Sequence, residues 1–398
     1  MPDRLVYRPF GAFRFLLAFL VLVKHFCADV APDWLADVTR PYAFGYVAVL
    51  VFFILSGFVI TEAVYHFYRH RPVGFIENRL LRIVPHYFLA LAAMIVVCLV
   101  FSDAGSLRVS RTETLPVGEA FEARNLLANL FGFVPFSNQM MDFDFIGIAW
   151  AIRVEMMFYL FFSAALWLER VAGRLFDRRL LTGILCLIVL ALCPLWFLSM
   201  AGRLPAMISL APYFIFGSAL YFLLRSRSRE SILMAFLAFA GCAAQFAVYS
   251  VHGREPGTEG GAWVEFTLLV GLVGAIIWLA ESRLTRLRSL DEALGRVTYP
   301  LYVFHPVVEV FILSLVPGYS YWAFVIGIAL SVAVSCLLQA LIDPTVDRIR
   351  DGVRGSRTGI GGSKGTDPFG GIIGAEPRHS PGRRPGPAEG VTRSGSRI

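Results

Sequence analysis

The chain has 398 residues, of which 57% are hydrophobic and only 16% are charged. Soluble domains carry about half apolar and about a quarter charged residues, so this composition excludes an ordinary soluble enzyme. Apolar runs long enough to cross a hydrocarbon core of about 30 Å recur along the sequence. We therefore expect an all-α, polytopic protein whose surroundings are the lipid bilayer.

The net charge of +7 comes mainly from arginines, which are scattered between apolar segments rather than gathered in one patch. This distribution indicates membrane topology signals and no nucleic-acid partner. The six cysteines all lie in apolar stretches without paired spacing, which is typical of small buried side chains. We expect no metal site and no tightly bound cofactor.

Ten membrane spans are predicted along the chain. They lie near residues 10–28, 43–65, 84–101, 148–168, 180–200, 207–224, 232–251, 262–280, 298–316 and 321–342. Arginine-rich segments alternate with segments that carry few cations, so the positive-inside rule predicts that both termini are cytoplasmic. The apolar stretch 125–136 is too short to cross, and we expect it to stay within the outer segment 102–147.

The last part of the chain differs from the rest in composition. It is rich in Gly, Pro, Ser and Arg and cannot bury enough apolar surface to offset the entropy of ordering. We expect a transmembrane domain over residues 1–345 and a disordered cytoplasmic tail over 346–398. The whole chain is expected to be a multi-pass protein of a bacterial inner (cell) membrane.

The first span carries two ionisable residues, Arg14 and His25, with ten residues between them. On an α-helix this spacing is about three turns, so both side chains share one face, about 16 Å apart along the axis. Ionisable groups inside a membrane span are costly and are candidates for function. The pair therefore predicts a polar track through the first helix.

Four further patterns place polar groups in or beside later spans. They are Phe52-Phe-Ile-Leu-Ser-Gly-Phe58, Arg79-Leu-Leu-Arg-Ile-Val-Pro85, Trp150-Ala-Ile-Arg-Val-Glu155 with its continuation to Tyr159, and Thr298-Tyr-Pro-Leu-Tyr-Val-Phe-His305. Each pattern alone has little specificity. Their order along the chain is more informative.

In this order the five patterns resemble the integral-membrane acyltransferase-3 family, whose members O-acylate saccharides and related acceptors. The resemblance runs from about residue 8 to residue 342. It implies transfer of an acyl group, expected to be acetyl and not aminoacyl, from acyl-CoA to a hydroxyl of a saccharide or glycolipid. The fourth pattern departs from the more common Trp-Ser-Leu-x-x-Glu, and Arg153 adds a cation near Glu155.

The resemblance and the chemistry together suggest catalytic roles for His25 and Glu155. An imidazole with a pKa near 6.5 can take the proton of a hydroxyl nucleophile, so His25 is the expected general base. Glu155 is expected either to orient His25 or to bind the acceptor. Alternatively, Glu155 is the counter-ion of Arg153 or of another arginine in a structural pair.

Three arginines are expected to bind the donor. Arg79 and Arg82 lie three residues apart at the start of a helix facing the cytoplasm, and paired guanidinium groups suit the phosphates of coenzyme A. Arg14, at the cytoplasmic end of the polar track, is expected to meet the same end of the donor. The alternative for Arg79 and Arg82 is ordinary positive-inside anchoring.

Four other residues are candidates for lining a cavity. Ser56 precedes Gly57 in the second span, which is typical of close helix packing, with a covalent acyl-serine as the alternative. His305 pairs at i, i+4 with Glu309 and either lines the cavity or forms a satisfied polar pair. Tyr159 and Tyr302 complete the set.

A rival hypothesis comes from another class of protein. A transporter or flippase of a polysaccharide or lipid-linked precursor would use the same intramembrane charges as a substrate pathway. Internal repeats are the usual sign of such transporters, and the sequence shows none. An acyltransferase is therefore favoured, and consumption of acyl-CoA would separate the two.

Overall fold

The computed structural model describes residues 7–68, 71–111, 117–172, 209–252, 260–282, 284–316, 318–354, 364–366 and 372–374. Nearly all of them are helical. The elements are α1 (Phe10–Asp29), α2 (Asp33–Thr39), α3 (Phe44–Ala63), η1 (Val64–Tyr68), α4 (Pro72–Asp103), α5 (Val117–Ala120), α6 (Ala123–Leu130), η2 (Ser137–Met140), α7 (Ala149–Ala172), α10 (Ala211–Ser226), α11 (Arg229–His252), α12 (Gly261–Glu281), α13 (Arg288–Leu315), α14 (Tyr321–Arg354), β1 (Lys364–Thr366) and β2 (Ile372–Gly374).

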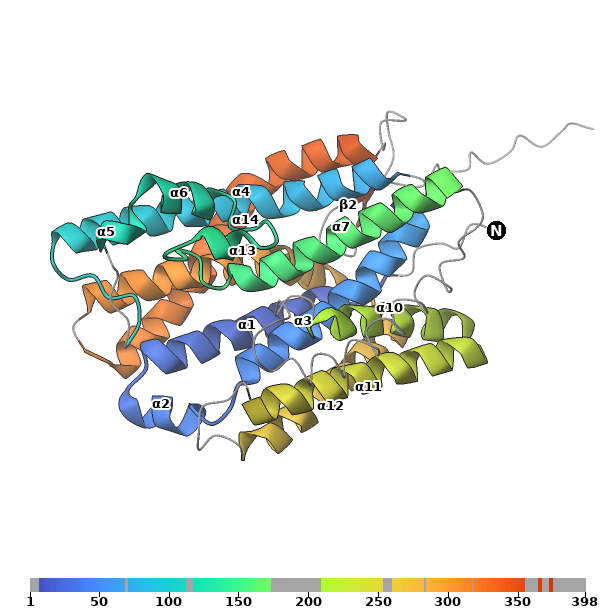
Figure 1. Ribbon diagram of the computed structural model, residues 1–398, viewed down its shortest axis with the longest axis horizontal. Helices are drawn as coiled ribbons and strands as arrows, with labels where there is room; N and C mark the ends of the chain where they lie inside the picture. The colour runs from blue at the N-terminus through green and yellow to red at the C-terminus, as the bar shows by residue number, and fades with distance from the viewer. Residues whose placement is uncertain are drawn as a thin grey trace, which may run out of the picture.

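The long helices form one bundle and run roughly side by side along its longest axis (Figure 1). In the described residues, eight helical segments are long and apolar enough to cross a membrane. Each of the eight coincides with one of the ten predicted spans. The all-α, polytopic class is confirmed.

Two of the predicted spans are not among these eight segments. The span at 207–224 corresponds to α10, whose described part has 16 residues, whereas about 20 are needed to cross a bilayer. The span at 180–200 lies outside the described residues.

The short helices gather at one end of the bundle, where α2, α5 and α6 lie on the left of Figure 1. The apolar stretch 125–136 contains most of α6, a helix of only 8 residues, followed by turns. It does not cross the bundle, as predicted. This end is the one that the charge pattern assigns to the outside.

The centre of the bundle is built around α1 and α3. Helix α1 packs against α13 on one side and α3 on the other, while α3 also packs against α10. The crossing of α3 and α10 needs glycine on both helices, because a Cβ at Gly57 would overlap the carbonyl oxygen of Phe214, and one at Gly217 that of Ile54. The small-residue packing predicted for Ser56-Gly57 is confirmed.

The predicted tail boundary at residue 346 is wrong, because α14 continues to Arg354. Polar contacts hold this extension: Arg350 donates through Nε and Nη2 to Oδ1 of Asn78 on α4, at 3.3 and 3.2 Å, and through Nη1 to Asp347 at 3.0 Å. Further on, β1 and β2 pair antiparallel, with Lys364 opposite Gly374. The other residues of the predicted tail lie outside the described part of the chain.

Candidate functional site

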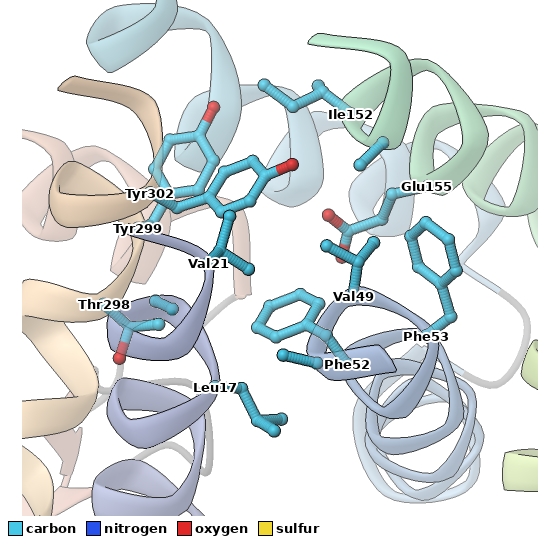
Figure 2. Close-up of a pocket in the computed structure, with 13 residues that line it drawn as sticks. Leu17, Val21, Val49, Phe52, Phe53, Ile152, Glu155, Thr298, Tyr299 and Tyr302 are labelled. Atoms are coloured by element: carbon cyan, nitrogen blue, oxygen red, sulfur yellow. The ribbon is translucent and has the colours of Figure 1, made fainter. Parts of the chain in front are cut away.

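A pocket lies inside the bundle between four helices, α1, α3, α7 and α13 (Figure 2). Its wall is almost wholly apolar. The lining residues are Leu17, Ala18, Val21, Ala48, Val49, Phe52, Phe53, Ala151, Ile152, Glu155, Thr298, Tyr299 and Tyr302. Glu155 is the only ionisable acid among them, so a single carboxylate marks an otherwise apolar space.

The carboxylate of Glu155 extends into this pocket (Figure 2). Tyr159, one turn further along α7, donates its hydroxyl to Oε1 of Glu155. The hydroxyl of Ser56 on α3 donates to the same oxygen at 3.4 Å. Oε1 therefore accepts both hydrogen bonds, and within the described part of the chain Oε2 accepts none.

Arg79 faces the interior rather than the cytoplasm, which corrects the prediction for this residue. It is only 2% exposed, and its guanidinium lies over the rings of Phe75 and Tyr159, 5.3 and 5.4 Å from their centroids. Arg79, Arg82 and Glu155 all lie within electrostatic range of the Tyr159 hydroxyl. These arginines supply positive charge on the cytoplasmic side of Glu155.

Arg14 is buried, with 3% of its surface exposed, at the cytoplasmic end of α1. Its side chain lies against α13 at Gly295, where a Cβ would approach Nη2 to 3.1 Å. The next turn of α1 contributes Leu17 and Ala18 to the pocket. The pocket therefore begins directly beyond Arg14 along the helix.

His25 lies near the other end of α1 and also faces α13, so the predicted shared face with Arg14 is confirmed. Its Nδ1 is 3.7 Å from Oε2 of Glu309, and its ring centroid is 5.1 Å from that of His305. The His25 side chain is 41% exposed and that of Glu309 only 6%. The carboxylate that faces His25 is thus Glu309, whereas the one expected there was Glu155.

His305 lies between the pair of His25 and Glu309 and the pocket residue Tyr302. It is fully buried, and its Nδ1 lies 3.3 Å from the carbonyl oxygen of Leu301. A carbonyl only accepts, so this hydrogen bond requires a proton on Nδ1 and leaves the lone pair on Nε2, for which the described residues offer no donor. The ring of Tyr302, which lines the pocket, lies 6.1 Å from that of His305.

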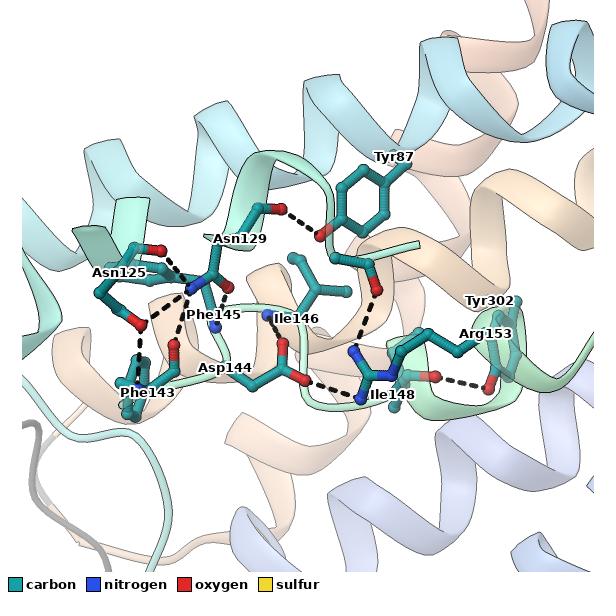
Figure 3. Close-up of polar contacts among 11 residues, drawn as sticks. Tyr87, Asn125, Asn129, Phe143, Asp144, Phe145, Ile146, Ile148, Arg153 and Tyr302 are labelled. Atoms are coloured by element: carbon teal, nitrogen blue, oxygen red, sulfur yellow. Dashed lines mark hydrogen bonds and ion pairs between the residues drawn. The ribbon is translucent and has the colours of Figure 1, made fainter. Parts of the chain in front are cut away.

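Arg153 is not the partner of Glu155, although the two are close in sequence. Its Nη1 donates to the carbonyl of Gly132 and its Nη2 to Oδ2 of Asp144, both at 3.0 Å (Figure 3). Burial raises the pKa of the Asp144 carboxyl above its ordinary value, and the nearby Arg153 opposes that rise. The hypothesis of an Arg153–Glu155 counter-ion pair is wrong.

The same network fixes the outer segment before α7 (Figure 3). Asn129 is fully buried; its Nδ2 donates to the carbonyls of Phe143, at 2.8 Å, and Asn125, at 3.0 Å, and its Oδ1 accepts from the N–H of Phe145 at 3.0 Å. Tyr302 donates to the carbonyl of Ile148 at 3.2 Å, just before α7 begins. These bonds set the start of α7 and hence the height of Glu155 in the bundle.

Three polar residues of the site are not among the predicted site residues. The sequence presents Glu309 only as a neighbour of His305 on the same helix, and Thr298 and Tyr299 only as members of a pattern. The signal for Glu309 was present, because a carboxylate in the middle of a span is a candidate for function. Nothing in the sequence states which helix it faces.

The comparisons with known proteins agree with this architecture. A family model described as an acyltransferase domain, the acyltransferase-3 model, matches residues 10–340. No curated protein and no solved structure matches the chain. The match covers every helix of the site from α1 to α13, and the chain therefore belongs to the acyltransferase-3 family as a membrane acyltransferase.

Proposed function

We propose that the protein is an O-acyltransferase of a bacterial inner membrane that transfers an acyl group from acyl-CoA to a hydroxyl of a saccharide or glycolipid. Acetyl-CoA is the expected donor, and the transferred group is not aminoacyl. Family membership supports acyl transfer in a membrane. The order of the five polar patterns supports the choice of donor and acceptor.

The observation that carries the proposal is the environment of His25. Its imidazole is partly exposed, while its Nδ1 faces the buried carboxylate of Glu309 at 3.7 Å. A carboxylate on that side favours a proton on Nδ1 and leaves Nε2 as the base. The distance is long for a hydrogen bond, and catalytic contacts of this kind tighten when substrate binds.

The reaction follows from this arrangement. The acceptor hydroxyl oxygen attacks the carbonyl carbon of the thioester, a C–O bond forms, and the C–S bond breaks. The hydroxyl proton passes to Nε2 of His25 and then to the leaving thiolate, which departs as the free thiol of coenzyme A. Glu309 stabilises the imidazolium in between.

The donor enters from the cytoplasmic side in this proposal. Arg14, Arg79 and Arg82 lie in that half of the bundle, and their positive charges suit the phosphates of coenzyme A. Arg79 is buried, so it acts through its charge rather than by direct contact with a phosphate. The rise of α1 between Arg14 and His25 is about 16 Å, which is about the length of a pantetheine arm. Phosphates held near Arg14 therefore allow the thioester to reach His25.

The acceptor approaches from the outer side. His25 is partly exposed and lies in the last turns of α1. That end of α1 lies toward the end of the bundle that carries α2, α5 and α6 (Figure 1). A saccharide or the head of a glycolipid can reach this end without entering the hydrocarbon core. The two substrates thus meet at His25 from opposite sides.

The test is the acyl-transfer activity of His25→Ala in the purified protein. Release of the coenzyme A thiol from acetyl-CoA is measured with a glycan fraction of the cell envelope as the acceptor. Loss of a general base lowers the rate by about 100- to 10,000-fold, while accumulation and thermal stability stay close to those of the unchanged protein.

His66→Ala is the matched control, because His66 lies in η1 at the cytoplasmic end of α3, away from His25. It should keep near-normal activity. Normal turnover of His25→Ala would move the base to another residue, with His305 as the next candidate. Transport of a precursor without any consumption of acyl-CoA would favour a transporter instead.

A further inference from the structure

The pocket lies on the line that joins the two ends of the polar track on α1. Leu17, Ala18 and Val21, which line it, stand between Arg14 and His25 in sequence and along the helix axis. In the proposed function the phosphates of the donor bind near Arg14 and its thioester near His25. The part of the donor between them is the pantetheine arm, and it would have to pass the pocket.

The wall of the pocket fits this arm in chemistry. A pantetheine arm is a slim chain of methylene groups interrupted by two amides. Alanines and valines of α1, α3 and α7 give the pocket apolar walls, and hydroxyl and carboxylate oxygens occur at a few points only. A saccharide, which presents hydroxyls on all sides, would leave most of them unpaired against these walls.

Glu155 supplies the polar contact that an amide requires. Its Oε1 already accepts from Tyr159 and Ser56, and Oε2 belongs to a carboxylate that extends into the pocket (Figure 2). Arg79 and Arg82 place positive charge on the cytoplasmic side of Glu155, and a carboxylate only accepts hydrogen bonds. Within the described part of the chain, Oε2 is the carboxylate oxygen of the pocket that accepts no hydrogen bond, so it is the charged acceptor offered to an N–H group that enters the pocket.

We infer that the pocket binds the pantetheine arm of the acyl donor and that Glu155 accepts a hydrogen bond from one of its amide N–H groups. This inference rests on the proposed function and adds a donor-binding residue to it. Glu155 is then a binding and positioning residue for the thioester, while His25 and Glu309 carry the proton transfer.

The test compares three donors on the full-length protein in lipid nanodiscs. One is acetyl-CoA, and the others are analogues in which either amide N–H of the arm is replaced by an ester oxygen, which keeps the size and removes the donor. Binding is measured by displacement of radiolabelled acetyl-CoA, without acceptor. One analogue should bind about 10- to 150-fold more weakly, as expected for loss of a hydrogen bond to a charged group.

Variants of Glu155 assign this difference to the residue. Glu155→Leu should bind acetyl-CoA and both analogues equally, and Glu155→Gln, whose amide oxygen still accepts, should discriminate weakly. Equal binding of all donors by the unchanged protein would overturn the inference, as would undiminished discrimination by Glu155→Leu. If Glu155→Leu does not fold, Glu155→Gln and the pocket variants below decide the question.

A matched pair on α7 tests the pocket itself. Ala151→Leu fills the pocket and should weaken acetyl-CoA binding at least tenfold, whereas Ala164→Leu, at an exposed position of the same helix, should not change it. If Ala151→Leu leaves donor binding intact and impairs only the acceptor, the pocket binds the acceptor and the inference fails. If the unchanged protein neither binds nor consumes acyl-CoA, the proposed function itself is wrong.

Discussion

Arg153 and Glu155 lie two residues apart on α7, and the structure uses them in opposite ways. Arg153 is 4% exposed, and both of its terminal nitrogens donate at 3.0 Å, one to Asp144 and one to the carbonyl of Gly132. Glu155, on another side of the helix, takes both of its hydrogen bonds on one oxygen and extends into the pocket. Both terminal nitrogens of Arg153 have an acceptor, whereas within the described residues only one oxygen of Glu155 accepts a hydrogen bond.

The difference teaches how to tell a structural charge from a functional one in a membrane protein. Both cost free energy when taken out of water, so both need partners. A charge whose hydrogen-bonding capacity is used within the fold stabilises one arrangement of the chain. A charge that can accept or donate a further hydrogen bond beside a pocket is available to a ligand. Substitution of Arg153 should therefore affect mainly stability, and substitution of Glu155 mainly ligand binding.

The largest effect is expected for Arg153→Leu. The change leaves the partly buried Asp144 carboxylate and the Gly132 carbonyl without their partner, and breaking a pair of which one member is buried costs up to about 3–5 kcal/mol of the free energy of unfolding. Chemical denaturation of the purified protein in micelles measures it. Arg124→Leu, at an exposed position of α6, is the control and should have almost no effect. Unchanged stability of Arg153→Leu would contradict the structural role.

The second effect is expected for Asn129→Ala in the outer segment. It removes the hydrogen bonds to the carbonyls of Phe143 and Asn125 and to the N–H of Phe145, all of them in a buried region. Unpaired buried groups cost about 1–3 kcal/mol each, and we expect a loss of about 2–3 kcal/mol after relaxation.

Limited proteolysis measures whether this segment loosens in Asn129→Ala. Cleavage between α4 and α7 should become faster, because the network no longer fixes the chain there. Asn138→Ala, whose side chain is exposed in η2, is the matched control and should be cleaved at the normal rate. Equal cleavage of both variants would show that Asn129 does not hold the segment.

A smaller effect on stability is expected for Glu155→Gln. The amide oxygen of Gln can still accept from Tyr159 and Ser56, so the loss should stay within about 1 kcal/mol. Donor binding should fall in the same variant. In the double variant Arg153→Ser with Glu155→Gln, the two losses should add within about 0.5 kcal/mol, because the residues share no partner. Recovery of stability in the double variant would restore the counter-ion hypothesis.

The sequence predicted well those features that depend on one helix at a time. Hydropathy located the spans, and the period of the helix placed Arg14 and His25 on one face, which in the structure is the face toward α13. The glycine at position 57 predicted a close helix crossing, and α10 provides it.

Features that depend on contacts between helices could not be predicted. A periodicity shows which side of a helix is polar but not which neighbour it meets, so Glu155 was expected at His25, where the structure has Glu309. Proximity in sequence suggested Arg153 for Glu155, but residues i and i+2 of a helix point to different sides. Arg79 followed the positive-inside pattern and is nevertheless buried against Tyr159.

The smallest effect is expected for Ser56→Ala, and it separates two roles of this serine. Its hydrogen bond to Glu155 is long, at 3.4 Å, and its residue is only 4% exposed and does not line the pocket. A serine that carries the acyl group in a covalent intermediate must reach the thioester, whereas this one is enclosed between α3 and α7.

We therefore expect a loss of stability within about 0.5 kcal/mol and a rate within about tenfold of normal, because Tyr159 still holds Oε1 of Glu155. Steady-state rates with acetyl-CoA measure this. Thr61→Val is the control on the same helix, because within the described residues its hydroxyl bonds to Gly57 and Ser218 and not to Glu155. A rate that falls by several orders of magnitude in Ser56→Ala, together with normal folding, would instead make Ser56 the nucleophile.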